Sequence, residues 1–178
     1  PFSWLWTKLG AIKKNPNTPI KFALGILQLG LGFLIFALTA HFIGENGKVP
    51  FIFVFLGYFL ITTGELFLSP IGLSKVTELS PKRMIGFMMG VWFLSSTFAH
   101  YISGILAKLT TTGTGSSENL LSKLSNWLMG NPDISSEAVA TLVQYNTIYA
   151  QIGIVTIIIS LFVILISPFI KKLMHGIH

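Results

Sequence analysis

The sequence predicts an all-α integral membrane protein with four full spanning helices. Of its 178 residues, 52% are hydrophobic and only 10% are charged, and the mean hydropathy is +0.72, whereas a soluble domain carries about 25% charged residues. Four largely apolar runs are each long enough to cross a bilayer. No run alternates as a barrel strand does, and helices pair every backbone group within lipid, so the four runs are expected to be helical.

The four predicted spans share a length of about 20 residues and a near absence of charge. They are placed at residues 22–43, 49–70, 84–107 and 148–170. Pro70 and Gly72 are expected to end the second span, because proline interrupts the hydrogen-bond ladder of a helix.

The segments around the spans complete the expected organisation. Residues 1–6, PFSWLW, are interpreted as the inner end of a preceding transmembrane helix, and residues 7–21 as a cytoplasmic loop. A cytoplasmic turn is expected at 71–83, an outer-face insertion at 108–147 and a cytoplasmic tail at 171–178. Because the sequence starts without Met and shows no signal peptide, it is expected to be the C-terminal part of a larger protein.

The basic residues predict the orientation, since cytoplasmic loops carry an excess of Lys and Arg. Nine lie on one side of the four crossings: Lys8, Lys13, Lys14, Lys21, Lys75, Lys82, Arg83, Lys171 and Lys172. Three lie on the other side: Lys48, Lys108 and Lys123. The first side, which holds both ends of the four-span block, is therefore expected to be cytoplasmic.

The outer insertion is too long for a simple turn. After a flexible TTTGTGSS stretch, it contains an apolar stripe at helical spacing, formed by Leu120, Leu121, Leu124, Trp127 and Leu128. A short amphipathic helix with this stripe either lies flat on the membrane surface or belongs to a solvated connector. Further on, Ser135 is a suitable N-cap with Glu137 in the first turn, so a helix is expected to start there and to continue into the last span.

Small residues in two spans indicate close helix packing. The first span contains Gly25, Gly30 and Gly32 together with Gln28. The third span carries Gly86 and Gly90, which have the four-residue spacing that lets two helices approach closely.

Glu65 is the only acidic residue within a predicted span. The other acidic residues fall in loops or at helix starts: Glu45, Glu78, Glu118, Asp133 and Glu137. At 3.6 residues per turn, Tyr58, Thr62 and Ser69 share a face with Glu65, and a polar stripe on a spanning helix points inward. The carboxylate is suited to hold a proton or to pair with an ammonium group. The alternative is a hydrogen bond between helices with no role in transport.

The third span has a polar face as well. Trp92, Ser95, Ser96 and Ser103 share one side of this helix, with His100 at its flank. Such a face suits a wet cavity with an aromatic wall. His100 is suited either to relay protons or to make a structural hydrogen bond.

Several classes of protein are excluded by the sequence. There is no cysteine, and the four histidines are scattered, so no metal site is expected. The net charge of +6 comes from few basic residues without interleaved aromatics, which argues against nucleic-acid binding. No catalytic pair, nucleophile motif or phosphate-binding glycine loop is present, so the chain is predicted to be neither an enzyme nor the holder of a cofactor.

The stretch GELFLSPIGLSKVTELSPKRMIGFMMGVWFLSS, residues 64–96, resembles the signature of the proton-dependent oligopeptide transporter family of the major facilitator superfamily. In that family, a tenth helix with GE and SPxGLS is followed by a cytoplasmic SPxR turn and an eleventh helix with GxMMGxWFLS. The similarity extends from residue 1 to about residue 106, with the last span matching the twelfth helix by position. The resemblance implies the C-terminal part of a twelve-helix transporter.

The resemblance also implies a binding site for substrate. Glu65 occupies the place of the glutamate that recognises the free amino terminus of a di- or tripeptide, with Ser69 beside the peptide and Trp92 in the pocket or cavity wall. With Ser96 from the polar face of the third span, the candidate substrate-binding residues are Glu65, Ser69, Trp92 and Ser96. His100 departs from the family, which commonly has Gly-Asn where this chain has Ala-His.

The expected function is therefore the C-terminal part of a proton-coupled symporter of di- and tripeptides in the bacterial inner membrane, with a cytoplasmic C-terminus. Its partners would be the peptide, the lipid bilayer and the N-terminal part of the same transporter, which would hold the proton-coupling motif. The proton is the coupling ion. Two alternatives remain, a transporter of another small solute such as nitrate and a membrane scaffold subunit without transport.

Overall fold

The computed structural model of the chain describes residues 17–44, 48–112, 120–130 and 137–173. Every regular element among these residues is helical: α2 (Thr18–Leu38), the short 3-10 helix η1 (Thr39–Phe42), α3 (Phe51–Leu79), α4 (Ile85–Thr112), α5 (Leu120–Met129) and α6 (Glu137–Leu173). Helices α2, α3, α4 and α6 are long and apolar enough to cross a membrane. The prediction of an all-α membrane protein with four spanning helices is confirmed.

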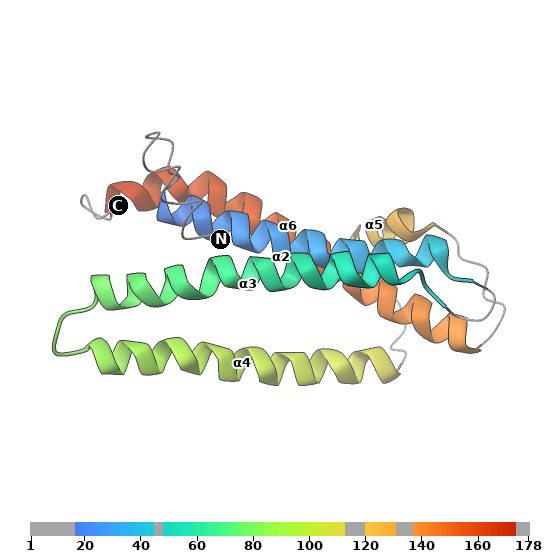
Figure 1. The fold of residues 1–178 in the computed structure, drawn as a ribbon, viewed down its shortest axis with the longest axis horizontal. Coiled ribbons are helices and arrows are strands. Elements are labelled where there is room, and N and C mark those ends of the chain that lie inside the picture. The colour runs from blue at the N-terminus through green and yellow to red at the C-terminus, as the bar shows by residue number, and fades with distance from the viewer. Residues whose placement is uncertain (1–16, 45–47, 113–119, 131–136, 174–178) are drawn as a thin grey trace.

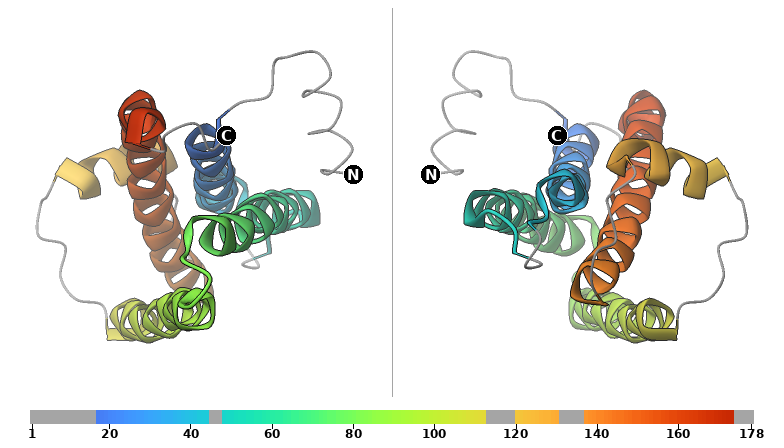
Figure 2. Two further views of the ribbon diagram at one scale, coloured as in Figure 1. Left: turned by 90° about the vertical axis from the view of Figure 1, so that its left-hand side faces the viewer. Right: turned by 90° about the vertical axis from the view of Figure 1, so that its right-hand side faces the viewer.

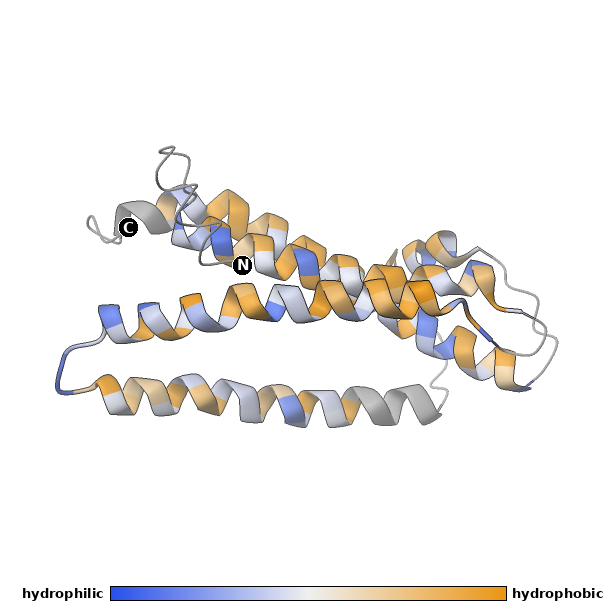
Figure 3. Ribbon diagram, viewed as in Figure 1, coloured by the Kyte–Doolittle hydropathy of each residue, from blue (hydrophilic) through white to orange (hydrophobic). Residues whose placement is uncertain are grey.

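The four long helices lie side by side along the long axis of the molecule (Figure 1). Helix α2 packs extensively against both α6 and α3, whereas α4 contacts the rest of the chain mainly through α3. The end views in Figure 2 show α4 set apart from α2, with α5 beside α6. Hydrophobic residues cover the long helices, and hydrophilic residues gather at the α3–α4 connection (Figure 3).

The end of α3 differs from the sequence-based expectation. Pro70 lies inside the helix, which continues through Gly72 to Leu79, so residues 71–79 are helical where a turn was expected. The helix ends at Ser80, whose extended backbone (φ −84°, ψ 138°) precedes Pro81. A residue before proline is disfavoured in the helical region, which explains why the stop is here. Membrane helices tolerate an internal proline because neighbouring groups satisfy the freed carbonyl.

Other helix limits also extend past the predicted spans. Helix α2 begins at Thr18, with Pro19 in the first turn, where its missing N–H costs no hydrogen bond. Helix α4 continues to Thr112. Helix α6 runs unbroken from Glu137 to Leu173, as expected for a helix that starts near there and enters the last span. Ser135 itself lies outside the described residues.

Glycines bring α2, α3 and α6 into close contact, which confirms the packing expected from the first span. A Cβ atom on Gly64 would lie 3.0 Å from the Gly25 carbonyl, and one on Gly32 would lie 3.1 Å from the Gly57 carbonyl. On the other side of α2, a Cβ atom on Gly30 would lie 3.2 Å from the Gly153 carbonyl. Backbones approach this closely only where side chains are absent, so these positions fix how α3 and α6 are rotated against α2.

Polar bonds connect the same three helices. The Gln28 amide donates to the Thr63 hydroxyl between α2 and α3. Between α2 and α6, Ser160 Oγ donates to the Ala23 carbonyl at 2.7 Å. Each bond satisfies a polar group that lipid would leave unpaired, so it adds to the glycine contacts.

The small-residue spacing in the third span has no such role among the described residues. A Cβ atom on Gly86 or on Gly90 would meet no atom within 4 Å. The close approach expected from these two glycines is therefore wrong for the described part of this chain, because the neighbouring helix lies on a different side of α4.

Candidate functional site

Glu65 lies on a flank of α3 that α2 leaves uncovered. The preceding residue, Gly64, is buried against α2, whereas Glu65 is exposed. Successive helical residues are about 100° apart, so the glycine contact turns the carboxylate away from α2. Within the part of the chain that the structure describes, no hydrogen bond or ion pair engages this carboxylate.

The polar stripe expected on α3 is present. Thr62, Glu65 and Ser69 are exposed, and Tyr58 is 63% exposed. The ring of Tyr58 meets Phe36 of α2 edge to face, with 5.3 Å between centroids. These four residues therefore form one largely exposed strip along α3, and its carboxylate is Glu65.

A contact between Gly72 and Trp92 sets the register of α4 on α3. A Cβ atom on Gly72 would overlap the indole ring of Trp92, so this position accepts only glycine without a shift of the ring. The two helices are antiparallel (Figure 1). Residues before Gly72 on α3 therefore lie level with residues after Trp92 on α4.

This register places Ser69 level with Ser96, one turn from the Gly72–Trp92 contact. Glu65 lies seven residues before Gly72, and His100 lies eight residues after Trp92, which puts both about 10–12 Å from the contact along the helix axes. The candidate residues from the two helices therefore share one stretch of the α3–α4 pair.

The side chains of α4 have different surroundings within this stretch. Trp92 is half-buried, while Ser95, Ser96 and His100 are exposed. Ser95 Oγ donates to the Trp92 carbonyl at 2.6 Å, which occupies its proton within the helix. Ser96 is exposed on the same side of α4, and its role as a binding residue stays a prediction.

A cavity of about 530 Å³ lies beside the Gly72–Trp92 contact, toward the α3–α4 connection. It is lined mainly by apolar side chains from the start of α2, the end of α3 and α4, among them Phe22, Leu79, Met88 and Trp92. Of the four candidate residues, Trp92 alone lines it. Glu65, Ser69 and Ser96 do not line this cavity, whereas Trp92 and its neighbour Ser95 do.

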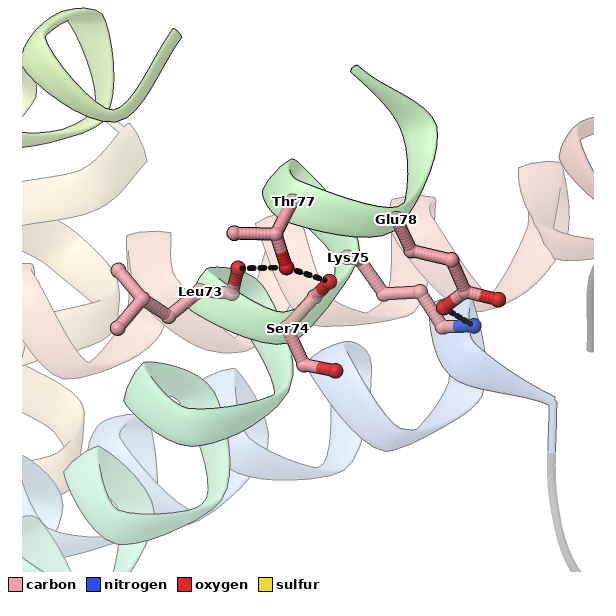
Figure 4. Close-up of polar contacts among 5 residues, drawn as sticks. All are labelled: Leu73, Ser74, Lys75, Thr77 and Glu78. Atoms are coloured by element: carbon pink, nitrogen blue, oxygen red, sulfur yellow. Dashed lines mark hydrogen bonds and ion pairs between the residues drawn. The ribbon is translucent and has the colours of Figure 1, made fainter. Parts of the chain in front are cut away.

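An ion pair near this cavity was not anticipated from the sequence. Lys75 Nζ lies 2.6 Å from Glu78 Oε2, three residues along α3 (Figure 4). In the same turn, Thr77 Oγ1 donates to the Ser74 carbonyl at 2.7 Å. The three-residue spacing of opposite charges is the signal that could have indicated the pair, had residues 71–79 been assigned to a helix.

No cluster of three potential metal ligands among His, Cys, Asp and Glu occurs in the described residues. The arrangement offers instead one carboxylate, several hydroxyl groups and an aromatic ring. Such groups bind a ligand through charge and hydrogen bonds.

Comparison with known proteins gives a consistent result. The POT family matches residues 1–128. The chain is 34% identical over 155 residues to the dipeptide and tripeptide permease A of Chromobacterium violaceum. It is 30% identical over 173 residues to the dipeptide and tripeptide permease B of Aeromonas hydrophila, and 31% identical over 176 residues to the uncharacterized transporter YclF of Bacillus subtilis.

These matches cover 87%, 97% and 99% of this chain but 28%, 31% and 29% of the relatives. The chain therefore spans about three tenths of the length of the curated relatives it matches.

Proposed function

Since the chain belongs to the POT family, we propose that it is the C-terminal part of a proton-coupled symporter of di- and tripeptides, in which Glu65 binds the amino terminus of the peptide. Peptide transport is the activity named for two of the relatives above. The four spanning helices make the chain part of a multi-pass membrane protein.

The observation that carries the proposal is the uncovered carboxylate of Glu65. A buried charge is costly in a membrane, and carboxylates within spans usually face a cavity or a partner. Glu65 is turned away from α2 by the Gly64–Gly25 contact and lies in a strip of exposed polar side chains. An ammonium group is the ligand whose charge complements this strip.

The register of α3 and α4 supports the other residues of the proposed site. Ser69 lies one turn from Glu65 on the same strip, suited to hydrogen-bond the peptide backbone. Ser96 lies level with Ser69 on α4, and Trp92 forms the end of this stretch toward the apolar cavity. A peptide with its amino terminus at Glu65 would therefore extend along α3 toward Trp92.

The remaining parts of the proposal concern the whole transporter. The substrate would lie between this bundle and the N-terminal part, and access would alternate by rocking of the two parts. The proton is the coupling ion, with its coupling groups in the N-terminal part. The excess of basic residues on one side supports a cytoplasmic C-terminus, and the proposed location is a bacterial inner membrane.

The test uses the full-length transporter in proteoliposomes. Uptake of labelled dialanine under an inward proton gradient is compared for wild type, Glu65→Gln and the control Glu137→Gln. Glu137 is an exposed carboxylate in the first turn of α6, away from the strip. We expect uptake by wild type and the control, and a loss of at least about tenfold in Glu65→Gln, which corresponds to a loss of about 1.4 kcal/mol of binding.

Competition sharpens the assignment of Glu65. N-acetylated dialanine lacks the ammonium group, so it should compete far less well than free dialanine for the wild-type transporter. Equal competition would refute amino-terminus recognition. Wild-type transporter without proton-driven uptake would refute peptide symport, and equal uptake by Glu65→Gln would leave Glu65 with a structural role.

A further inference from the structure

Helix α5 exposes its apolar side. Leu120 and Trp127 are 79% and 80% exposed, and Leu124 is 41% exposed, whereas Ser125 and Met129 are buried. At about 100° per residue, the three exposed side chains form one stripe on the side opposite Ser125 and Met129. A helix on the surface of a soluble protein has the reverse arrangement, with its apolar stripe toward the core.

Helix α5 is held firmly to the bundle on its other side. Met129 packs in a buried cluster with Ala37, Ala40 and Ala150, from α2, η1 and α6. The ring nitrogen Nε2 of His41 donates to the Leu128 carbonyl at 2.8 Å. These contacts determine which side of α5 faces outward, so the exposed stripe is a consequence of how the helix docks.

The placement of α5 suits the surface of a bilayer. Figure 2 shows α5 lying across the long axis of the spanning helices, beside α6. Its buried contacts are at the end of α2 and in η1, where the first span finishes. At this same end, Phe42 of η1 and Phe51 of α3 are exposed. The stripe on α5 is therefore near the limit of the lipid-facing surface of the spans.

The residues beside the stripe fit the same environment. Lys123 and Asn126 are exposed on one flank of it. Tryptophan and lysine are common at membrane interfaces, where the ring sits at headgroup level and the ammonium group meets phosphates.

We propose that α5 is an interfacial helix, which inserts Leu120, Leu124 and Trp127 into the boundary between headgroups and acyl chains of the adjacent leaflet. The lipid surface is the occupant that the structure favours, because α5 packs mainly on α6 and α2, away from the polar strip of α3 at the proposed substrate site. This inference rests on the membrane-spanning character of the chain and is independent of the cargo.

The experiment measures the depth of Trp127 in the full-length transporter in phosphatidylcholine nanodiscs. All other tryptophans are replaced by Phe, and Trp127 fluorescence is quenched either by lipid brominated near the carbonyl end of the acyl chain or by aqueous iodide. We expect strong quenching by the brominated lipid, weak quenching by iodide and a blue-shifted emission. The matched control moves the probe to the polar flank with Trp127→Phe and Asn126→Trp, where iodide should quench more and lipid less.

Two results would overturn the proposal. Quenching of Trp127 by iodide without quenching by lipid would make α5 part of a solvated connector. Protection from both quenchers would place the stripe against protein, such as the N-terminal part of the transporter. If the background lacking the other tryptophans does not fold, the lipid quenching of wild type minus that of Trp127→Phe gives the same comparison.

Discussion

Helices α2, α3 and α6 form a closely packed group, while α4 stands against α3 with little else around it. The three packed helices meet at glycine contacts and polar bonds. None of the described α4 side chains from Ile85 to Ile105 is buried. Glu65 is therefore carried by a helix of the packed group, whereas α4 meets the described part of the chain mainly through α3, in part at the Gly72–Trp92 contact. We expect α4 to complete its packing on parts of the transporter outside this chain.

The largest expected effect comes from filling the contact between α2 and α6. Gly30→Leu should lower stability by about 3 kcal/mol, because a Cβ atom there already lies 2.8 Å from Ile157 Cγ1 and 3.2 Å from a backbone oxygen. The measurement is the thermal unfolding of full-length transporter in detergent. The control Leu31→Phe, at an exposed neighbouring position, should change it little. An equal loss in both variants would contradict the role of the glycine contacts.

A smaller effect is expected where α4 meets α3. Gly72→Ala places a methyl group in the Trp92 ring, so the ring must move, at a cost of about 1–3 kcal/mol. Trp92→Leu removes the overlapping ring atoms. The double variant should therefore lose less stability than the sum of the two single variants, which a double-mutant cycle of thermal unfolding measures. Additive losses would mean that the two residues do not meet in the membrane.

The smallest expected effect concerns the polar bond between α2 and α3. Replacing Gln28 by Leu and Thr63 by Val, singly and together, should reveal a coupling of about 0.6 kcal/mol, the average for such bonds between membrane helices. The same unfolding measurement applies. A coupling indistinguishable from zero would show that glycine contacts alone hold α3 in its rotation.

Much of the fold was predictable because long apolar runs leave few alternatives within lipid. The four spans, the helix in the outer insertion and the long last helix all follow from local hydropathy and capping signals. The end of α3 was predicted incorrectly at Pro70. Pro81 is a local signal for the end of the helix at Ser80, but Pro70 gives the same signal earlier. Whether the helix continues past Pro70 depends on whether neighbouring groups bond the carbonyl that Pro70 leaves unpaired.

Some features of the candidate site could also be predicted from the sequence, and others could not. Glu65 stands out because it is the one acidic residue in a span, and Tyr58, Thr62 and Ser69 share its face by helical spacing. The Gly72–Trp92 contact was not predictable, since glycine spacing on α4 pointed to Gly86 and Gly90, which meet no described neighbour. Glycines on α2 and α4 thus had different outcomes, because α2 lies between α3 and α6, whereas α4 meets the described part of the chain mainly through α3.

The sequence by itself determined the membrane-spanning helices, the isolated carboxylate and the family, since each rests on the cost of placing a given residue in lipid or on a continuous motif. The tertiary structure decided which glycines face a neighbouring helix, the register of α3 on α4 and the outward side of α5. These features depend on the rotation of each helix and on the neighbour it meets, and distant parts of the chain set both.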